Sequence, residues 1–119
     1  MTFNLQIIGV LKSRETQKAI RFFKERNIKA HFVNLLERAL SKGELENIAH
    51  AIPFEELIDR NSKEYKKKGL KFMVYDIEEE LLNNPLLLHI PIVRNGKNAT
   101  AGYQPEIWKA WIKEAKDEA

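Results

Sequence analysis

The first 35 residues switch from one apolar pattern to another and back, and this order constrains the fold more than any other feature. Residues 3–9 carry β-branched and aromatic side chains and end at Gly9, which is typical of a strand. From Ser13 to Arg26 apolar residues recur at helical spacing, with charged residues on the other face, and Asn27 is expected to end the helix. A second strand is predicted over 30–35. A strand, a helix and a strand in this order imply two parallel strands joined by a right-handed crossover.

The middle of the chain, residues 37–88, is predicted to be a helical insert. Its capping and proline signals predict four helix starts, at Ser41, Pro53, Ser62 and Asp76. Ser41 and Glu44 have the spacing of a capping box, and Pro53 is expected at the first position of its helix.

After residue 88 the pattern predicts two short strands and a helix. Asn95-Gly96 is expected to form a type I′ hairpin turn between strands at 91–94 and 97–101. Pro105 begins the last helix, which is expected to bury one apolar face. That face consists of Ile107, Trp108, Trp111 and Ile112. The complete order, β-α-β, helical insert, β-β-α, predicts an α/β fold with a small mixed sheet and helices on both faces.

Length and composition limit the classes of function. The 119 residues predict a single domain, with a core of 1–36 and 89–119 around the insert at 37–88. The chain has no cysteine, which excludes disulfides and all thiol chemistry. A net charge of +3 gives no reason to expect direct nucleic-acid binding. Without a long apolar run or a signal-peptide pattern, we expect a cytoplasmic protein that does not bind membranes.

The turn before the first helix is the main candidate site. Free N–H groups and the helix dipole at such a turn favour an anion or an activated nucleophile. Ser13 and Thr16 can place hydroxyls there, and Lys12 and Arg14 add positive charge. The alternative is structural, because serine is a preferred N-cap residue. The sequence leaves both roles for Ser13 open.

The histidines give little support to catalysis by this serine. A serine nucleophile needs a general base, whereas His31, His50 and His89 are dispersed and follow no recognisable triad order. Two of them could approach each other in the fold, but no further ligand at a metal-binding spacing accompanies them. We therefore expect neither a serine hydrolase nor a metal site.

Two other features have both a functional and a structural interpretation. Lys66, Lys67 and Lys68 next to Tyr65 could bind phosphates, or could form a solvated helix face diluted by nearby acids. The Ile90–Pro91 bond is either cis, which would be functional, or simply the start of a strand. The sequence alone does not decide between these alternatives.

Four segments resemble the arsenate reductase (ArsC) and Spx family of thioredoxin-fold proteins, and together they extend over nearly the whole chain. They are S-R-E-T-Q-K-A, L-I-D-R-N-S-K-E-Y-K, N-N-P-L-L-L-H-I-P-I-V-R-N-G and A-G-Y-Q-P-E. The first occupies the place of the family's C-x-x-C or C-x-x-S motif, and the third is similar to N-P-x-L-L-x-R-P-I-V. The last resembles the V-G-Y of Spx. The resemblance implies a thioredoxin/glutaredoxin-like mixed sheet.

The same resemblance assigns expected roles to individual residues. Ser13 corresponds to the redox cysteine, and Thr16 to the second position of that motif. Gln17 and Ile90 replace two arginines of the family pattern, and Pro91 matches a proline that is cis in thioredoxin folds. Gln104 lies near where arsenate reductases carry another arginine that binds oxyanions. Each of these departures argues against the thiol chemistry of the family.

Three functions are compatible with this pattern. The first, which we favour, is a non-redox binding or regulatory protein that has lost the catalytic cysteine. The second is an Spx-like regulator that binds the α subunit of RNA polymerase, although Pro53 replaces a glycine of the Spx pattern. The third is a glutaredoxin-dependent arsenate reductase, if Ser13 replaces a native cysteine. Glutathione or an oxyanion is the ligand that the resemblance implies. The residues expected to bind it are Lys12, Ser13, Arg14, Thr16, Gln17 and Pro91.

Overall fold

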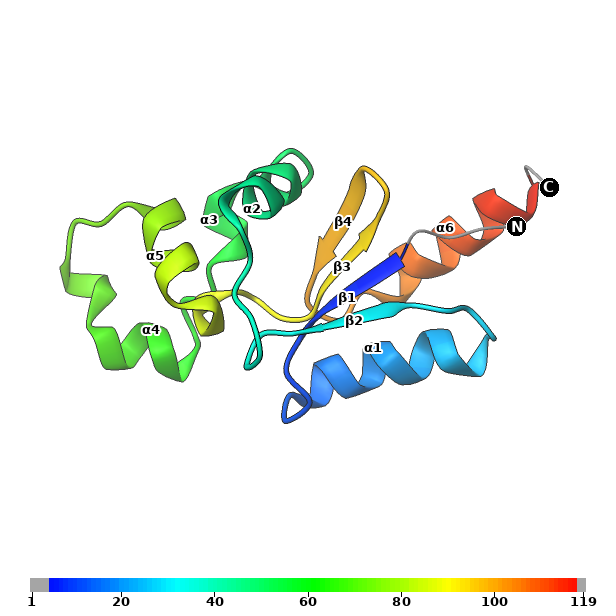
Figure 1. Cartoon of the computed structure of the whole chain (residues 1–119), viewed down its shortest axis with the longest axis horizontal. Helices are drawn as coiled ribbons and strands as arrows, with labels where there is room; N and C mark the ends of the chain where they lie inside the picture. The colour runs from blue at the N-terminus through cyan, green and yellow to red at the C-terminus, as the bar shows by residue number, and fades with distance from the viewer. Residues whose placement is uncertain (1–4, 118–119) are drawn as a thin grey trace.

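The structure is a computed structural model that describes residues 5–117. Its core elements are β1 (Leu5–Gly9), α1 (Arg14–Glu25), β2 (His31–Asn34), β3 (Ile92–Asn95), β4 (Asn98–Ala101) and α6 (Pro105–Asp117). The strands form one sheet in the order β2-β1-β3-β4, as Figure 1 shows. β1 is parallel to β2 and antiparallel to β3, which is antiparallel to β4. The predicted mixed sheet is confirmed. Phe3 and Asn4 of the predicted first strand lie outside the described residues.

Each face of the sheet has its own apolar core, because successive side chains of a strand point to opposite faces. Ile7 points to the face covered by α1 and α6, where Phe23 and Trp108 are also buried. The rings of these two aromatic residues have centroids 5.3 Å apart. Ile8 points to the other face and packs in a core that includes Leu45 of the insert. Helices therefore contribute to the packing on both faces, as the element order predicts.

α1 ends in a hydrogen-bonded motif that the sequence signals. Asn27 has φ 58°, the left-handed conformation expected of a residue that stops a helix. Its N–H donates to the carbonyl of Lys24 at 3.1 Å, and the N–H of Ile28 donates to the carbonyl of Phe23 at 3.0 Å. These two bonds form a Schellman motif, which directs the chain back along the sheet into β2.

The insert forms a helical extension at one end of the molecule, visible in green in Figure 1. Its helices are α2 (Lys42–Ala49), α3 (Phe54–Leu57), α4 (Lys63–Lys68) and α5 (Ile77–Asn83), with 3-10 turns at Leu70–Phe72 and Pro85–Leu87. The capping box of Ser41 and Glu44 is confirmed. Pro53 is the N-cap residue of α3 and not its first helical residue, because its ψ of 149° is still extended. An isolated antiparallel β-bridge pairs Ile58 with Leu88, the last residue of the insert before the chain returns to the core.

The predicted type I′ turn at Asn95-Gly96 is wrong in register and in type. Asn95 pairs with Asn98, so the central residues of the turn are Gly96 and Lys97. Of these two only Gly96 has a positive φ, of 61°, whereas a type I′ turn requires positive φ at both positions. Glycine at the first central position is the arrangement of a type II′ turn.

The apolar face predicted for the last helix is narrower than expected. Trp108 is fully buried and Trp111 nearly so, but Ile107 is 43% exposed. Adjacent helical residues differ by about 100° in direction, so burying Trp108 turns Ile107 away from the core. With 13 residues α6 is the longest helix among residues 5–117, and no helix in that range is long and apolar enough to cross a membrane.

Candidate functional site

The turn between β1 and α1 places Ser13 at the N-cap of the helix. The N–H of Ser13 donates to the carbonyl of Val10 at 3.1 Å, which closes the turn. Its side-chain Oγ accepts the N–H of Thr16 at 3.2 Å, and its backbone is extended. Both features define an N-cap residue. Of the two roles that the sequence left open for Ser13, the structure contains the capping role.

Thr16 does not present its side chain to the turn. It is fully buried and faces the backbone of Gly9, where a Cβ atom would lie 2.5 Å from Thr16 Oγ1. Within residues 5–117 this hydroxyl has no hydrogen-bond partner. The second position of the expected motif is therefore used for packing α1 against β1.

The rest of the turn has a net positive charge, because Lys12 and Arg14 outweigh Glu15 in the first turn of α1. Lys12 and Arg14 are exposed, and the structure records no ion pair for either within the described part of the chain. Gln17 is exposed as well, and its side-chain amide donates to the carbonyl of Leu11. The turn combines free cations with helix N–H groups, an arrangement that favours an anionic partner.

Pro91 lies at the same end of the sheet as this turn. The Ile90–Pro91 bond is cis, the isomer that the resemblance implies. Ile8 pairs with Ile92, so the register brings Pro91 next to the end of β1 at Gly9. Pro91 is buried, and its carbonyl accepts the N–H of Gly102 at 2.9 Å. The sheet thus brings the two predicted parts of the site to the same end of its central strands.

The side chains that the resemblance places at or near arginines of the family pattern carry no guanidinium here. The amides of Gln17 and Gln104 donate to the local carbonyls of Leu11 and Ala101. Ile90 packs against the apolar core on the insert side. These side chains supply no positive charge, so an oxyanion at this end of the sheet would depend on the exposed Lys12 and Arg14 and on backbone N–H groups.

A cleft of about 330 Å³ lies near this end of the sheet, against β4 and α6. Glu56, His89 and Gln104 contribute its polar lining. His89 is half-buried, with its ring close to Gly102, whereas His31 and His50 are exposed on other elements. No group of three or more His, Asp or Glu side chains within residues 5–117 could hold a metal ion. The carboxylate of Glu56 makes this cleft unfavourable for an anion.

The basic segment of the insert lies away from the sheet. Lys66, Lys67 and Lys68 are exposed on α4, and Lys68 forms an ion pair with Glu80 of α5. Tyr65 is buried beneath them. The structure therefore does not bring this basic segment together with the turn at Ser13.

A sequence model of the ArsC family matches residues 10–111 of the chain. The structure of an arsenate reductase from Vibrio cholerae is 18% identical, with a TM-score of 0.78 over 90% of this chain and 96% of that one. A protein described as related to the ArsC family, from Bacteroides fragilis, is 20% identical, with a TM-score of 0.78 over 92% and 98%. An ArsC-related protein from Brucella melitensis is 19% identical, with a TM-score of 0.69 over 92% and 95%. A comparison with curated protein sequences found no match. At these identities the structural likeness establishes the thioredoxin-like fold.

Proposed function

The chain belongs to the ArsC family, and we propose that it is a member without thiol redox activity that acts as a binding or regulatory protein. The observation that carries this proposal is the state of Ser13, whose Oγ caps α1 at the position of the family's redox cysteine. The whole sequence contains no cysteine. A serine hydroxyl cannot form a mixed disulfide with glutathione, which the family's thiolate mechanism requires.

The surroundings of Ser13 support the same proposal. A serine nucleophile needs a base within hydrogen-bond reach, and within residues 5–117 Oγ is bonded only to the N–H of Thr16. In the family, arginines at the positions of Gln17 and Ile90 and near Gln104 would have stabilised an anionic intermediate. The side-chain amides of Gln17 and Gln104 donate to local carbonyls instead. Because several residues depart from the family pattern, natural loss of the redox activity is favoured over a single substitution of the cysteine.

The intact scaffold favours a role in binding. The turn keeps exposed Lys12 and Arg14 beside cis-Pro91, which suits an anionic or acidic partner. Glutathione, an oxyanion and the α subunit of RNA polymerase are the candidates that follow from family resemblance. Tyr103 of the Spx-like A-G-Y segment is 38% exposed, with the Lys18 ammonium 5.6 Å from its ring centre. We place this function in the cytoplasm, which cell fractionation would test.

A matched pair of cysteine variants tests the loss of redox function. Ser13→Cys restores the thiol at the family position, whereas Ser62→Cys places one at another half-buried N-cap serine, that of α4. Glutathione- and glutaredoxin-coupled arsenate reduction is then measured. We expect no activity from the natural chain and equal background from both variants. Arsenate reduction by Ser13→Cys alone would contradict the argument that the other departures have also abolished the activity, and would favour a reductase whose only missing group is the thiol.

The binding role needs a separate measurement. A two-dimensional NMR titration with glutathione, and separately with arsenate, monitors the amides of 12–17 and those near Pro91. Saturable shifts confined to these amides would identify a small ligand. If these amides respond to neither ligand, a protein partner is the remaining alternative, and a pull-down with the α subunit of RNA polymerase tests the Spx-like one. Failure of both measurements would contradict a binding role for this turn.

A further inference from the structure

A row of polar side chains crosses the sheet at the end opposite the Ser13 turn. The cross-strand register aligns His31, Gln6 and Arg94 in this row. Residues in one row point to the same face, and Gln6 is two positions before Ile8, whose face is that of the insert. The insert therefore has an apolar row of the sheet beneath it and a polar row beside it.

A cleft of about 610 Å³ opens between α2 and the β3–β4 hairpin at this polar row. Its lining residues are Asn47, His50, Arg94, Gly96 and Lys97. They include two cations, an imidazole and an amide, and no carboxylate. The volume lies within the range of about 300–1,000 Å³ that is typical of small-molecule sites.

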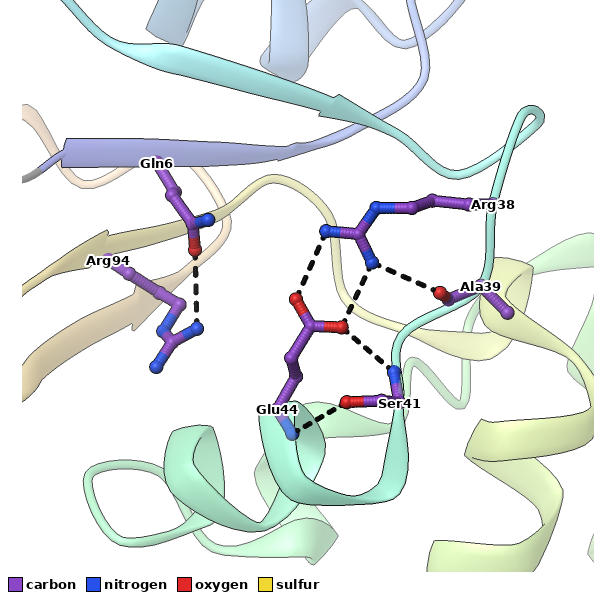
Figure 2. A network of polar contacts seen from close by, with 6 residues as sticks. All are labelled: Gln6, Arg38, Ala39, Ser41, Glu44 and Arg94. Atoms are coloured by element: carbon purple, nitrogen blue, oxygen red, sulfur yellow. Dashed lines mark hydrogen bonds and ion pairs between the residues drawn. The ribbon is translucent and has the colours of Figure 1, made fainter.

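Arg94 is the half-buried cation of this cleft. Its Nη1 donates to Oε1 of Gln6 at 3.2 Å, as Figure 2 shows, which fixes the orientation of the guanidinium. Within residues 5–117 Arg94 makes no ion pair. A partly buried guanidinium without a counter-ion presents its remaining N–H groups in the fork that suits a carboxylate or a phosphate.

The carboxylate of Glu44, which Figure 2 shows on the same side of the sheet, already has its partners. Arg38 binds both of its oxygens, at 2.9 and 3.0 Å, and the N–H of Ser41 donates to one of them at 2.9 Å. This network holds the first turn of α2, and Asn47 and His50 at the other end of that helix line the cleft. Glu44 therefore neutralises Arg38 and leaves Arg94 free for a ligand.

We propose that this cleft binds a small organic molecule through a phosphate or carboxylate group held by the Arg94 fork, with Lys97 and His50 at its rim. The site is distinct from the Ser13 turn, because the hairpin lies beside Leu5 at the start of β1. The four steps from Leu5 to Gly9 span about 13 Å. The inference thus goes beyond the proposed function, and neither depends on the other.

NMR titrations with inorganic phosphate and, separately, with succinate test this site at constant ionic strength, with sodium chloride as the blank. We expect saturable shifts at the amides of 47–50 and 94–98. Arg94→Gln should weaken binding about tenfold or more, because a charged hydrogen-bonding group is lost. Arg21→Gln, at an exposed position on α1, is the matched control and should bind as the natural chain does. A stronger response to phosphate or to succinate identifies the source of the oxyanion.

Loss of folding in Arg94→Gln would be visible as loss of amide dispersion. In that case His50→Ala and Lys97→Gln carry the test, because both residues are exposed and neither change disturbs the core. Each should weaken binding about threefold or more. Non-saturating shifts, shifts confined to residues 12–17, or equal binding by these variants and the natural chain would overturn the proposal.

Discussion

Thr16 Oγ1 and Gly9 are in such close contact that a Cβ atom on residue 9 would lie 2.5 Å from the oxygen. Thr16 is fully buried, so its side chain cannot move aside into solvent. Glycine is needed here for the close approach of α1 to β1. We expect Gly9→Ala to lower the free energy of unfolding by about 1–3 kcal/mol, the usual cost of overpacking a core, as measured by urea denaturation.

Gly43 provides the matched control for this substitution. It lies exposed in α2, and the nearest atom to a Cβ there would be 4.0 Å away. Gly43→Ala should raise the free energy of unfolding by up to about 1 kcal/mol, because alanine favours the helix. Adding Thr16→Ala to Gly9→Ala should recover part of the loss. Equal stability of Gly9→Ala and the natural chain would show that the contact yields easily.

The buried hydroxyl of Thr16 is expected to lower the free energy of unfolding. Within residues 5–117 its oxygen is buried without a hydrogen-bond partner, and such a group loses the hydrogen bonds it would make with water. Thr16→Val replaces it with a methyl group of similar shape. We expect the free energy of unfolding to rise by about 1 kcal/mol, measured by the same denaturation. A decrease of that size would instead mean that the hydroxyl has a partner, such as an ordered water.

Ser13 should behave as a helix cap in stability measurements. Its Oγ satisfies the N–H of Thr16, so Ser13→Ala should lower the free energy of unfolding by about 1 kcal/mol. Ser13→Asp should restore most of this loss, because aspartate is an equally good cap and its charge suits the helix N-terminus. Equal losses in both variants would mean that Ser13 contributes something other than capping. Thermal unfolding followed by circular dichroism provides the comparison.

Local signals in the sequence predicted the element boundaries well. The caps at Ser13, Ser41 and Ser62 and the stop at Asn27 all depend on groups within a few positions of one another. The geometry of such contacts is set by the local backbone, so residue type and spacing are sufficient to find them. The assignment of the family rested on similar local motifs, and the match over residues 10–111 confirms it.

Contacts between residues far apart in the chain could not be predicted from the sequence. Gln6 and Arg94 are 88 positions apart, and only the register of β1 with β3 aligns them. The wrong prediction at Asn95-Gly96 has a local cause: Asn95 pairs with Asn98, so the turn lies one residue further along the chain than its residue types indicate. The contact of Thr16 with Gly9 depends on how α1 lies on β1. A sequence can therefore suggest a hydroxyl at the turn without showing that it faces the strand.

A buried hydrogen bond joins α6 to β4. Nε1 of Trp108 donates to Oγ1 of Thr100 at 2.8 Å, and both residues are buried. Thr100→Val would leave the indole N–H without an acceptor in the core, so we expect a loss of about 1–3 kcal/mol in the free energy of unfolding. Urea denaturation followed by tryptophan fluorescence measures it. Thr100→Ser keeps the hydroxyl and should lose less. A Thr100→Val variant as stable as the natural chain would contradict this role.

The ion pair of Arg38 and Glu44 makes a pH-dependent contribution to stability. Hydrogen bonds from Arg38 hold the pKa of Glu44 at about 2, below its ordinary value of 4.5. Because the pKa is lower in the folded state, the contribution is fully present above 4.5 and is lost as the pH falls from 4.5 towards 2. Both side chains are partly exposed, which reduces the contribution to about 1 kcal/mol.

Glu44→Gln isolates this ionic contribution, since glutamine at the same position can still complete the capping box. The free energy of unfolding of Glu44→Gln should be lower than that of the natural chain near neutral pH, and the difference should vanish near pH 2. Glu46→Gln, at an exposed position on the same helix, is the control and should show little difference at any pH. Urea denaturation over this pH range measures both. A difference that stays constant as the pH falls would mean that Glu44 stabilises α2 through its shape and capping bond and not through its charge.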